Sequence, residues 1–134
     1  MTPNDCIFHL LTRSAKSATR CWKQEVEPFG VTAVQGKVLN FMYGLDDLAA
    51  SELGELTALD GATLTGVVDR LCAMKLIERQ QDENDRRSVR LSLTEDGHGI
   101  AQSIHAVMEP ANDKFLSDFS EQEVAQLKGL LARL

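Results

Sequence analysis

The chain lacks any apolar run that approaches the ~20 residues of a membrane-spanning helix. Its N-terminus also lacks the charged, apolar and small-residue pattern of a secretory signal peptide. We therefore expect no membrane association and a cytoplasmic location. With 134 residues, of which 43% are hydrophobic and 25% are charged, the chain has the composition of one ordinary globular domain.

Cysteine is scarce, and its spacing excludes the common cysteine-dependent folds. Cys6, Cys21 and Cys72 are odd in number, widely separated and without a CxxC pair. This pattern disfavours a disulfide framework or a zinc knuckle and is typical of reduced thiols. His98 and His105 could share one helix face, but two histidines without nearby ligating carboxylates make a poor metal site. We expect no bound metal.

A catalytic signature is also missing. The sequence has no glycine-rich phosphate loop, and Gly97-His98-Gly99 is too short to cradle a phosphate. No set of nucleophile and base stands apart from the helical pattern. We expect a protein that is not an enzyme and that carries no cofactor.

Basic residues are fewer than acidic ones, 14 against 20, which gives a net charge of −6 at pH 7. Such a balance argues against a nucleic-acid partner unless the basic residues are concentrated at one place. Arg86, Arg87 and Arg90 lie within a span of five residues, inside a stretch that is otherwise acidic. A basic tip on an acidic body predicts DNA binding that is weak on random sequence and strongly dependent on salt.

The middle of the chain predicts two short helices joined by a tight turn. The first covers residues 50–56, with Ser51 as its candidate cap, and the second covers residues 62–74 after a cap at Asp60. The second helix has one apolar stripe, formed by Leu64, Val67, Val68, Leu71 and Met74. The residues off this stripe are small or polar: Thr63, Thr65, Gly66, Asp69 and Arg70. This order is typical of a helix-turn-helix.

Residues 76–97 predict a short β-hairpin with a long charged tip. An apolar pair leads into the tip, and an alternating run from Val89 to Leu93 returns from it. Asp85, Arg86 and Arg87 lie in the tip. Two adjacent guanidinium groups on a projecting hairpin suit a nucleic-acid groove better than a protein interior. The alternative is a solvated loop whose arginines pair with the acidic residues around them.

Helices are predicted on both sides of this central region. Residues 5 to about 27 form the first, whose apolar face has few partners nearby in sequence, so we expect a second subunit to cover it. Thr32 and Gln35 form a capping box at the start of the next helix. The buried face of that helix is expected to comprise Val34, Val38, Leu39, Phe41 and Met42. Residues 45–49 are expected to be a linker.

Two more helices are predicted after the hairpin. Thr94 opens a long helix that Pro110 could kink or restart. A second capping box, at Ser120 and Glu123, introduces the final helix. The fold class is therefore mainly α with a small β-hairpin (α+β).

This order of elements resembles the MarR family of winged-helix regulators over nearly the whole chain. The resemblance is most specific in residues 53–97. The motifs that carry it are Gly30-Val31-Thr32-x-x-Gln35, Val68-Asp69-Arg70-Leu71, Leu76-Ile77-Glu78-Arg79, Asp85-x-Arg87 and Leu93-Thr94-x-x-Gly97. Together these motifs form a strong signal, whereas any one of them alone is weak.

The resemblance implies a winged helix-turn-helix regulator, expected to be a repressor, that binds a pseudo-palindromic double-stranded DNA operator as a homodimer. It implies one MarR-type domain over residues 1–134, with the DNA-binding lobe in residues 32–97. Residues 1–31 and 98–134 are then dimerisation helices. The different-class alternative is an adaptor that keeps the fold but binds protein instead of DNA.

The resemblance also implies roles for single residues. Arg87 is the wing residue that enters the minor groove, Asp85 is the carboxylate that orients it, and Arg86 adds a phosphate contact. Thr63 and Thr65 are candidates for base edges. The candidates for phosphate contacts are Gln35, Ser51 and Arg70. Gly66 occupies a position where relatives often carry a longer side chain, so base readout is expected to be lean and more dependent on DNA shape.

The signal that releases the DNA is expected to be a small ligand, for which an aromatic or phenolic effector is the candidate. His9, Arg13 and Phe41 are the candidate pocket residues, with Arg13 placed to pair with an aromatic carboxylate. The alternative, which we favour for His9 and Arg13, is a solvated or dimer-facing polar pair.

Oxidant sensing through a cysteine is the other candidate signal. Some relatives sense peroxide through a cysteine on the first helix, and Cys6 and Cys21 are the candidates in this chain. Cys6 falls about two residues short of the usual sensing position, where this chain has Phe8. Cys21 has Arg20 and Lys23 nearby but shares the apolar stripe, so burial competes with activation.

Overall fold

The computed structural model describes all residues, 1–134, and is mainly helical with a small antiparallel sheet. This confirms the predicted fold class. The helices are η1 (Pro3–Asp5), α1 (Ile7–Val26), η2 (Glu27–Phe29), α2 (Ala33–Met42), α3 (Ala50–Thr57), α4 (Gly61–Ala73), α5 (Glu95–Phe115) and α6 (Glu121–Leu131). The strands are β1 (Leu48–Ala49), β2 (Ile77–Gln81) and β3 (Val89–Leu93). No helix is both long and apolar enough to cross a lipid bilayer.

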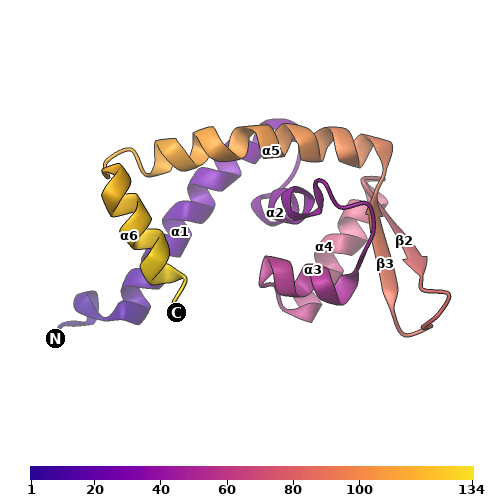
Figure 1. Ribbon diagram of the computed structural model, residues 1–134, viewed down its shortest axis with the longest axis horizontal. Helices are drawn as coiled ribbons and strands as arrows, with labels where there is room; N and C mark the ends of the chain where they lie inside the picture. Colours follow the sequence, from indigo (N-terminus) through magenta and orange to yellow (C-terminus); the bar gives the residue numbers. More distant parts are fainter.

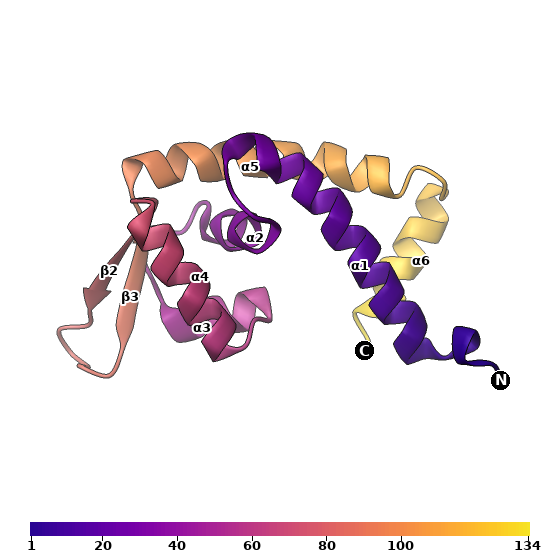
Figure 2. The ribbon, with the colours of Figure 1, turned by 180° about the vertical axis from the view of Figure 1, so that it is seen from behind.

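The long helix α5 connects two ends of the molecule (Figure 1). At one end lie α6, most of α1 and both chain termini. At the other end lie α2, α3, α4 and the hairpin of β2 and β3, which projects away from α5 (Figure 2). Helices α3 and α4 extend from α5 on the same side as the hairpin, so both reach the same face of the molecule.

The sheet has the strand order β1-β3-β2, and both pairings are antiparallel. Ile77 pairs with Leu93 at the base of the hairpin, and Gln81 pairs with Val89 near its tip. Leu48 pairs with Leu91, and both side chains are buried. The prediction of a linker at residues 45–49 is therefore wrong at its end, because this segment adds a strand to the outer side of β3.

Side chains predicted from sequence cap four helices. Thr32 and Gln35 form the predicted capping box, with hydrogen bonds of 3.2 and 3.0 Å. Asp60 Oδ1 accepts from the backbone N–H of Thr63 at 2.8 Å. Ser120 and Glu123 form the second capping box, and Thr94 caps α5. The prediction of Ser51 as a cap is wrong, since the N-cap of α3 is Ala49 and Ser51 lies in the first turn.

The buried core lies in the end that carries the helix-turn-helix. The stripe of α4 is buried as predicted, except that Met74 is 42% exposed at the helix end. Phe41 was also expected to be buried, but it is exposed. Pro110 does not restart the helix, because α5 continues through it.

At the junction between the hairpin and α5, Gly97 packs more closely on its neighbours than any other glycine of the chain. The carbonyl of Leu76 accepts a hydrogen bond from the backbone N–H of Thr94 at 3.0 Å, and the hydroxyl of Thr94 donates to the carbonyl of Lys75 at 2.7 Å. Gly97 packs directly on the Leu76 carbonyl, where a Cβ atom would overlap the oxygen. The hairpin is thereby held against the first turn of α5.

Helices α1 and α6 leave most of their apolar residues exposed. Val26 is the one buried residue of α1, and α6 has none. The exposed apolar residues at this end are Ile7, Phe8, Leu10, Phe115, Phe119, Leu127, Leu130, Leu131 and Leu134. An apolar surface of this extent is unusual for a free monomer.

Candidate nucleic-acid interface

The outer face of α4 is open to solvent over its length. Thr63, Thr65, Gly66, Asp69 and Arg70 are all exposed, as their position off the apolar stripe predicts. The opposite face of α4 packs into the core and fixes the orientation of the helix. Hydrogen bonds from the Thr63 backbone and hydroxyl lower the pKa of the Asp60 carboxyl at the start of the helix.

An ion pair connects α4 with the hairpin. The guanidinium of Arg79 on β2 donates to Asp69 on α4. This hydrogen bond is the main reason why the pKa of Arg79 is raised. Cys72 lies beside the pair, and burial raises the pKa of its thiol. Both charged side chains are about half exposed, so we expect the ion pair to contribute little stability. It connects the outer face of α4 with β2.

The tip of the hairpin is ordered by its own polar groups. Asp82 and Ser88 close it with a backbone hydrogen bond of 3.0 Å. Asp85 Oδ1 accepts from the backbone N–H of Arg87 at 2.9 Å, and Gln81 Nε2 donates to the carbonyl of Arg86 at 2.7 Å. Asp85 thus bonds the backbone of Arg87, and its predicted role in orienting the guanidinium is not seen in the free chain.

Both tip arginines have free guanidinium groups. Arg86 and Arg87 are exposed, and neither belongs to any of the ion pairs of the chain. The ion pairs that the alternative of a solvated loop expected are therefore absent, whereas the exposure that it expected is present. Arg90 differs, since its Nε lies 3.2 Å from both carboxylate oxygens of Asp47. Of the three clustered arginines, two remain available to a partner.

The predicted phosphate contacts fall in different surroundings. Arg70 and Ser51 are exposed, Arg70 on α4 and Ser51 at the start of α3. Gln35 is only 7% exposed, and its side-chain oxygen is occupied by the backbone N–H of Thr32. This burial removes Gln35 from the candidate DNA contacts. The side chain of Gln35 caps α2, and in this role it is not free to contact a DNA phosphate. The sequence motif predicted both roles.

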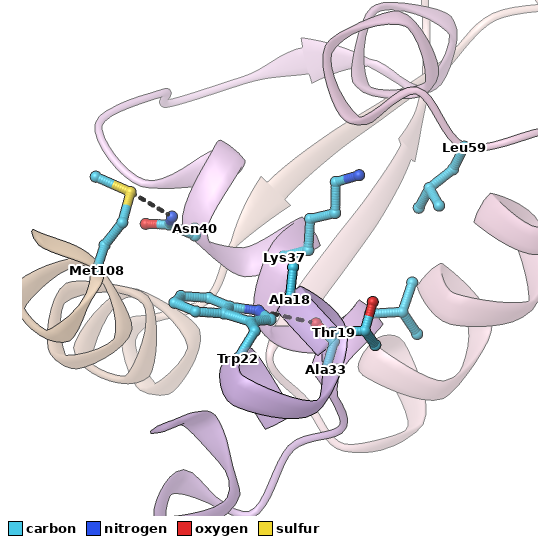
Figure 3. Close-up of a pocket in the computed structure, with 9 residues that line it drawn as sticks. Ala18, Thr19, Trp22, Ala33, Lys37, Asn40, Leu59 and Met108 are labelled. Atoms are coloured by element: carbon cyan, nitrogen blue, oxygen red, sulfur yellow. Dashed lines mark hydrogen bonds between the residues drawn. The ribbon is translucent and has the colours of Figure 1, made fainter. Parts of the chain in front are cut away.

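A cavity of about 460 Å³ lies between α1, α2, α5 and the turn before α4 (Figure 3). Its lining is mostly apolar and includes Trp22, whose Nε1 donates to the carbonyl of Ala33 at 3.1 Å. Lys37 of α2 extends along the cavity on the side of Leu59, and no ion pair of the chain includes Lys37. The remaining lining residues are Ala18, Thr19, Val34, Asn40 and Met108.

The residues predicted for the effector pocket do not line this cavity. His9, Arg13 and Phe41 are exposed, and none of them lines this cavity. His9 and Arg13 lie in the first half of α1, and their exposure is consistent with the favoured alternative of a solvated polar pair. Trp22 and Lys37 line the cavity but were not predicted to do so, because their spacing in sequence gave no sign that they share it.

The polar side of the cavity continues onto α5. Asn40 Nδ2 donates to the sulfur of Met108 at 3.1 Å, and Asn40 Oδ1 lies 3.0 Å from Nδ1 of His105. The ring of Tyr43 lies against His105 and His98, with ring centroids 4.7 and 5.7 Å apart. Both histidines are therefore engaged in the contact of α2 with α5.

The candidate redox cysteines occupy different positions. Cys6 is half-buried at the N-cap of α1. Cys21 is half-buried and lines a smaller cavity of about 200 Å³ between α1 and α5. No two cysteines form a disulfide.

Comparisons with known proteins agree with this geometry. The sequence profile of the MarR family matches residues 29–88. The chain is 34% identical to the organic hydroperoxide resistance transcriptional regulator of Bacillus subtilis (strain 168), over 93% of this chain and 84% of that protein. The structure is similar to that of a MarR mutant from E. coli complexed with operator DNA, with a TM-score of 0.87, 28% identity and coverage of 97% and 95% of the two chains. It is also similar to the PcaV transcriptional regulator from Streptomyces coelicolor in complex with its natural ligand, with a TM-score of 0.89, 26% identity and coverage of 99% and 94%.

Proposed function

The chain belongs to the MarR family and is a DNA-binding transcriptional regulator, and from this premise we propose that it is a homodimeric repressor released by a small aromatic anion. Its operator is a pseudo-palindrome, with α4 in the major groove and the hairpin as a wing in the minor groove. The observation that carries the DNA-binding mode is the position of the hairpin of β2 and β3, which extends on the same side of α5 as α4 (Figure 1) and whose tip holds two exposed arginines outside every ion pair of the chain.

Dimerisation is supported by the apolar surface at the α1 and α6 end. Phe119, Leu130 and Leu134 are 50%, 59% and 84% exposed, and no residue of α6 is buried. Burial of apolar surface stabilises by about 25 cal/mol per Å², so a second copy gives this end the core that it lacks alone. Residues 1–31 and 98–134 then act as the dimerisation helices and residues 32–97 as the DNA-binding lobe. Two lobes read two half-sites about one DNA turn apart.

The effector site that we propose is the cavity of Trp22 and Lys37. Its apolar lining and single unpaired cation suit a flat apolar anion such as an aromatic carboxylate. The similarity to a ligand-bound PcaV structure supports a ligand in this fold. Leu59, which lines the cavity, directly precedes the cap of α4, so a ligand there contacts the turn that sets the recognition helix. A small shift of α4 changes the spacing of the two half-site readers and favours release.

The test begins with selection of a duplex from a random library by the purified chain. Binding to that duplex should weaken linearly on a plot of log K against log salt, and a scrambled duplex should not bind. Benzoate should weaken operator binding, whereas neutral benzamide should not. Lys37→Met should remove the benzoate response, and Lys16→Met, a change of an exposed lysine outside the cavity, should keep it. A benzoate response that survives Lys37→Met contradicts the proposed site.

Oxidant sensing is the second candidate, because the relative from Bacillus subtilis is named as an organic hydroperoxide resistance regulator. Cys6 and Cys21 are the thiols on α1 that would carry it. An organic hydroperoxide should then weaken operator binding by the wild type, and the double variant Cys6→Ser with Cys21→Ser should not respond. Operator affinity that ignores the hydroperoxide in the wild type excludes this candidate.

A further inference from the structure

Thr63 and Thr65, the two threonines on the open face of α4, both donate their hydroxyl protons in hydrogen bonds within the chain. The hydroxyl of Thr63 donates to Asp60 Oδ2 and that of Thr65 donates to the carbonyl of Gly61, each at 2.8 Å. A hydroxyl has one proton to donate and two lone pairs that accept. Both side chains therefore present a methyl group and an accepting oxygen to whatever lies against α4.

The Thr63 hydroxyl is the more firmly held of the two. Its acceptor is a carboxylate, and a charge-assisted hydrogen bond is roughly twice as strong as a neutral one. The acceptor of Thr65 is a backbone carbonyl, and this contact follows the i to i−4 pattern of threonine in helices. In both cases donation to a base would first break an existing bond, whereas contact through the methyl group would not.

Gly66 adds an independent observation on the same face. A Cβ atom at this position would meet nothing within 4 Å, so the packing of the chain does not require glycine there. Its backbone is helical without a positive φ, and glycine in an exposed helix interior destabilises relative to alanine. Nothing within the fold offsets this cost. A partner that approaches the α4 backbone closely would explain the missing side chain.

Apart from Arg70 near the end of the helix, which is a candidate for phosphate contact, the same face offers no donor suited to guanine. The major-groove edge of guanine presents the N7 and O6 acceptors, which are read by arginine or lysine. Of the exposed residues before Arg70, only Asp69 is charged, and it accepts from Arg79. The major-groove edge of a T·A pair instead presents the thymine methyl group and the adenine amino donor. The thymine methyl group is the one that the exposed methyl group of a threonine matches.

We propose that α4 reads T·A pairs, with the methyl group of Thr65 packed on a thymine C5-methyl group and Gly66 allowing the close approach. This inference rests on the proposed placement of α4 in the major groove. The expected operator half-site then contains a thymine opposite Thr65. Thr65 and Gly66 become residues that determine sequence specificity.

The experiment uses the full chain and the duplex that it selects from a random library. Each thymine of the half-site is replaced in turn by deoxyuridine, which removes only the methyl group. At the position under Thr65 the affinity should fall about fourfold, as expected for one methyl group that loses its apolar contact. Thr65→Val, which keeps the methyl group, should bind within about twofold of the wild type, since the contact proposed for Thr65 is made by its methyl group. Thr65→Ser, which removes the methyl group, should bind about fourfold more weakly and become insensitive to deoxyuridine at that position.

Gly66→Ala provides a second test that does not depend on thymine. This variant should fold with raised thermal stability, but it should bind the selected duplex at least about fivefold more weakly, the lower end for a lost base contact. Gly99→Ala is the matched control, because Gly99 is also exposed, helical and free of neighbours within 4 Å. It should bind DNA as the wild type does.

The outcomes separate this inference from the proposed function. Binding that still requires Arg87 but ignores every deoxyuridine substitution overturns the reading of thymine and leaves DNA binding in place. If Thr65→Val lowers the affinity by more than about tenfold, as expected for loss of a strong hydrogen-bonded base contact, the hydroxyl is needed. That result also overturns the reading of thymine through the methyl group. If no duplex is selected at all, both the proposed operator binding and this inference fail.

Discussion

Gly97 is the position where one added methyl group should do most harm. A Cβ atom there would overlap the carbonyl oxygen of Leu76 and lie 2.8 Å from its carbonyl carbon. Both contacts are with backbone, which cannot rotate away as a side chain can. Leu76 is 5% exposed, and the same carbonyl accepts the backbone N–H of Thr94. Gly97→Ala must therefore push the start of the hairpin away from α5.

The expected loss of stability follows from three effects. Displacement of the Leu76 carbonyl weakens its hydrogen bond with Thr94, which contributes about 1 kcal/mol. Overpacking of a buried contact costs about 1–3 kcal/mol more. Alanine favours the helix over glycine by roughly 1 kcal/mol, which offsets part of this. We expect Gly97→Ala to lower the free energy of unfolding by about 2 kcal/mol.

Urea unfolding, followed by circular dichroism at one fixed chain concentration, measures this difference. Gly99→Ala is the control, because it makes the same chemical change two residues along α5 with nothing within 4 Å. The control should be as stable as the wild type or more stable, by up to about 1 kcal/mol. If Gly97→Ala unfolds at the same urea concentration as Gly99→Ala, the close packing of α5 on the hairpin does not exist in solution.

Three further predictions concern pH, a thiol and assembly. Because hydrogen bonds from Thr63 lower the pKa of Asp60 below 3.8, the stabilisation by Asp60 is complete above that pH and is lost as pH falls through the lower, folded value. Asp60→Asn should show a smaller loss of stability in this acid range, and parallel pH profiles would contradict the cap. Burial raises the pKa of the Cys72 thiol, so iodoacetamide at pH 7.5 should alkylate Cys72 more slowly than free cysteine, which peptide mass spectrometry can follow; an equal rate would refute this. Leu130→Asp should convert the proposed dimer to a monomer in sedimentation equilibrium, whereas Gln126→Asp on the same helix should not, and a dimeric Leu130→Asp would exclude α6 from the interface.

The sequence predicted those features of the fold that depend on neighbours within a few residues. The caps at Thr32, Asp60 and Ser120 each bond an amide three residues away, and the structure confirms all three. The alternating run from Val89 to Leu93 predicted β3 for the same reason, whereas β2 was expected only as the segment that leads into the hairpin tip. Strand β1 was missed, because a two-residue strand has no periodicity of its own and forms by pairing with Leu91 far along the chain.

In the candidate site, too, the features that depend on nearby residues could be predicted, and those that depend on distant elements could not. The open face of α4 follows from its apolar stripe, and the exposed tip of the hairpin follows from its polar sequence. The pairing of Arg90 with Asp47, and the cavity that places Lys37 near Trp22, depend on how distant elements pack. The sequence could not show which arginines stay free or which cation faces the cavity. Gln35 was misassigned because one motif served two competing roles.

The most direct test is the affinity of Arg87→Ala for the duplex that the wild type selects. Arg87 lies at the wing tip without an ion pair, so its removal should leave folding intact. The variant should lose about 1–3 kcal/mol of binding free energy, whereas Arg20→Ala, a change of an exposed arginine on α1, should bind as the wild type does. Equal affinity of Arg87→Ala and the wild type would contradict the assignment of the hairpin as a DNA-reading wing.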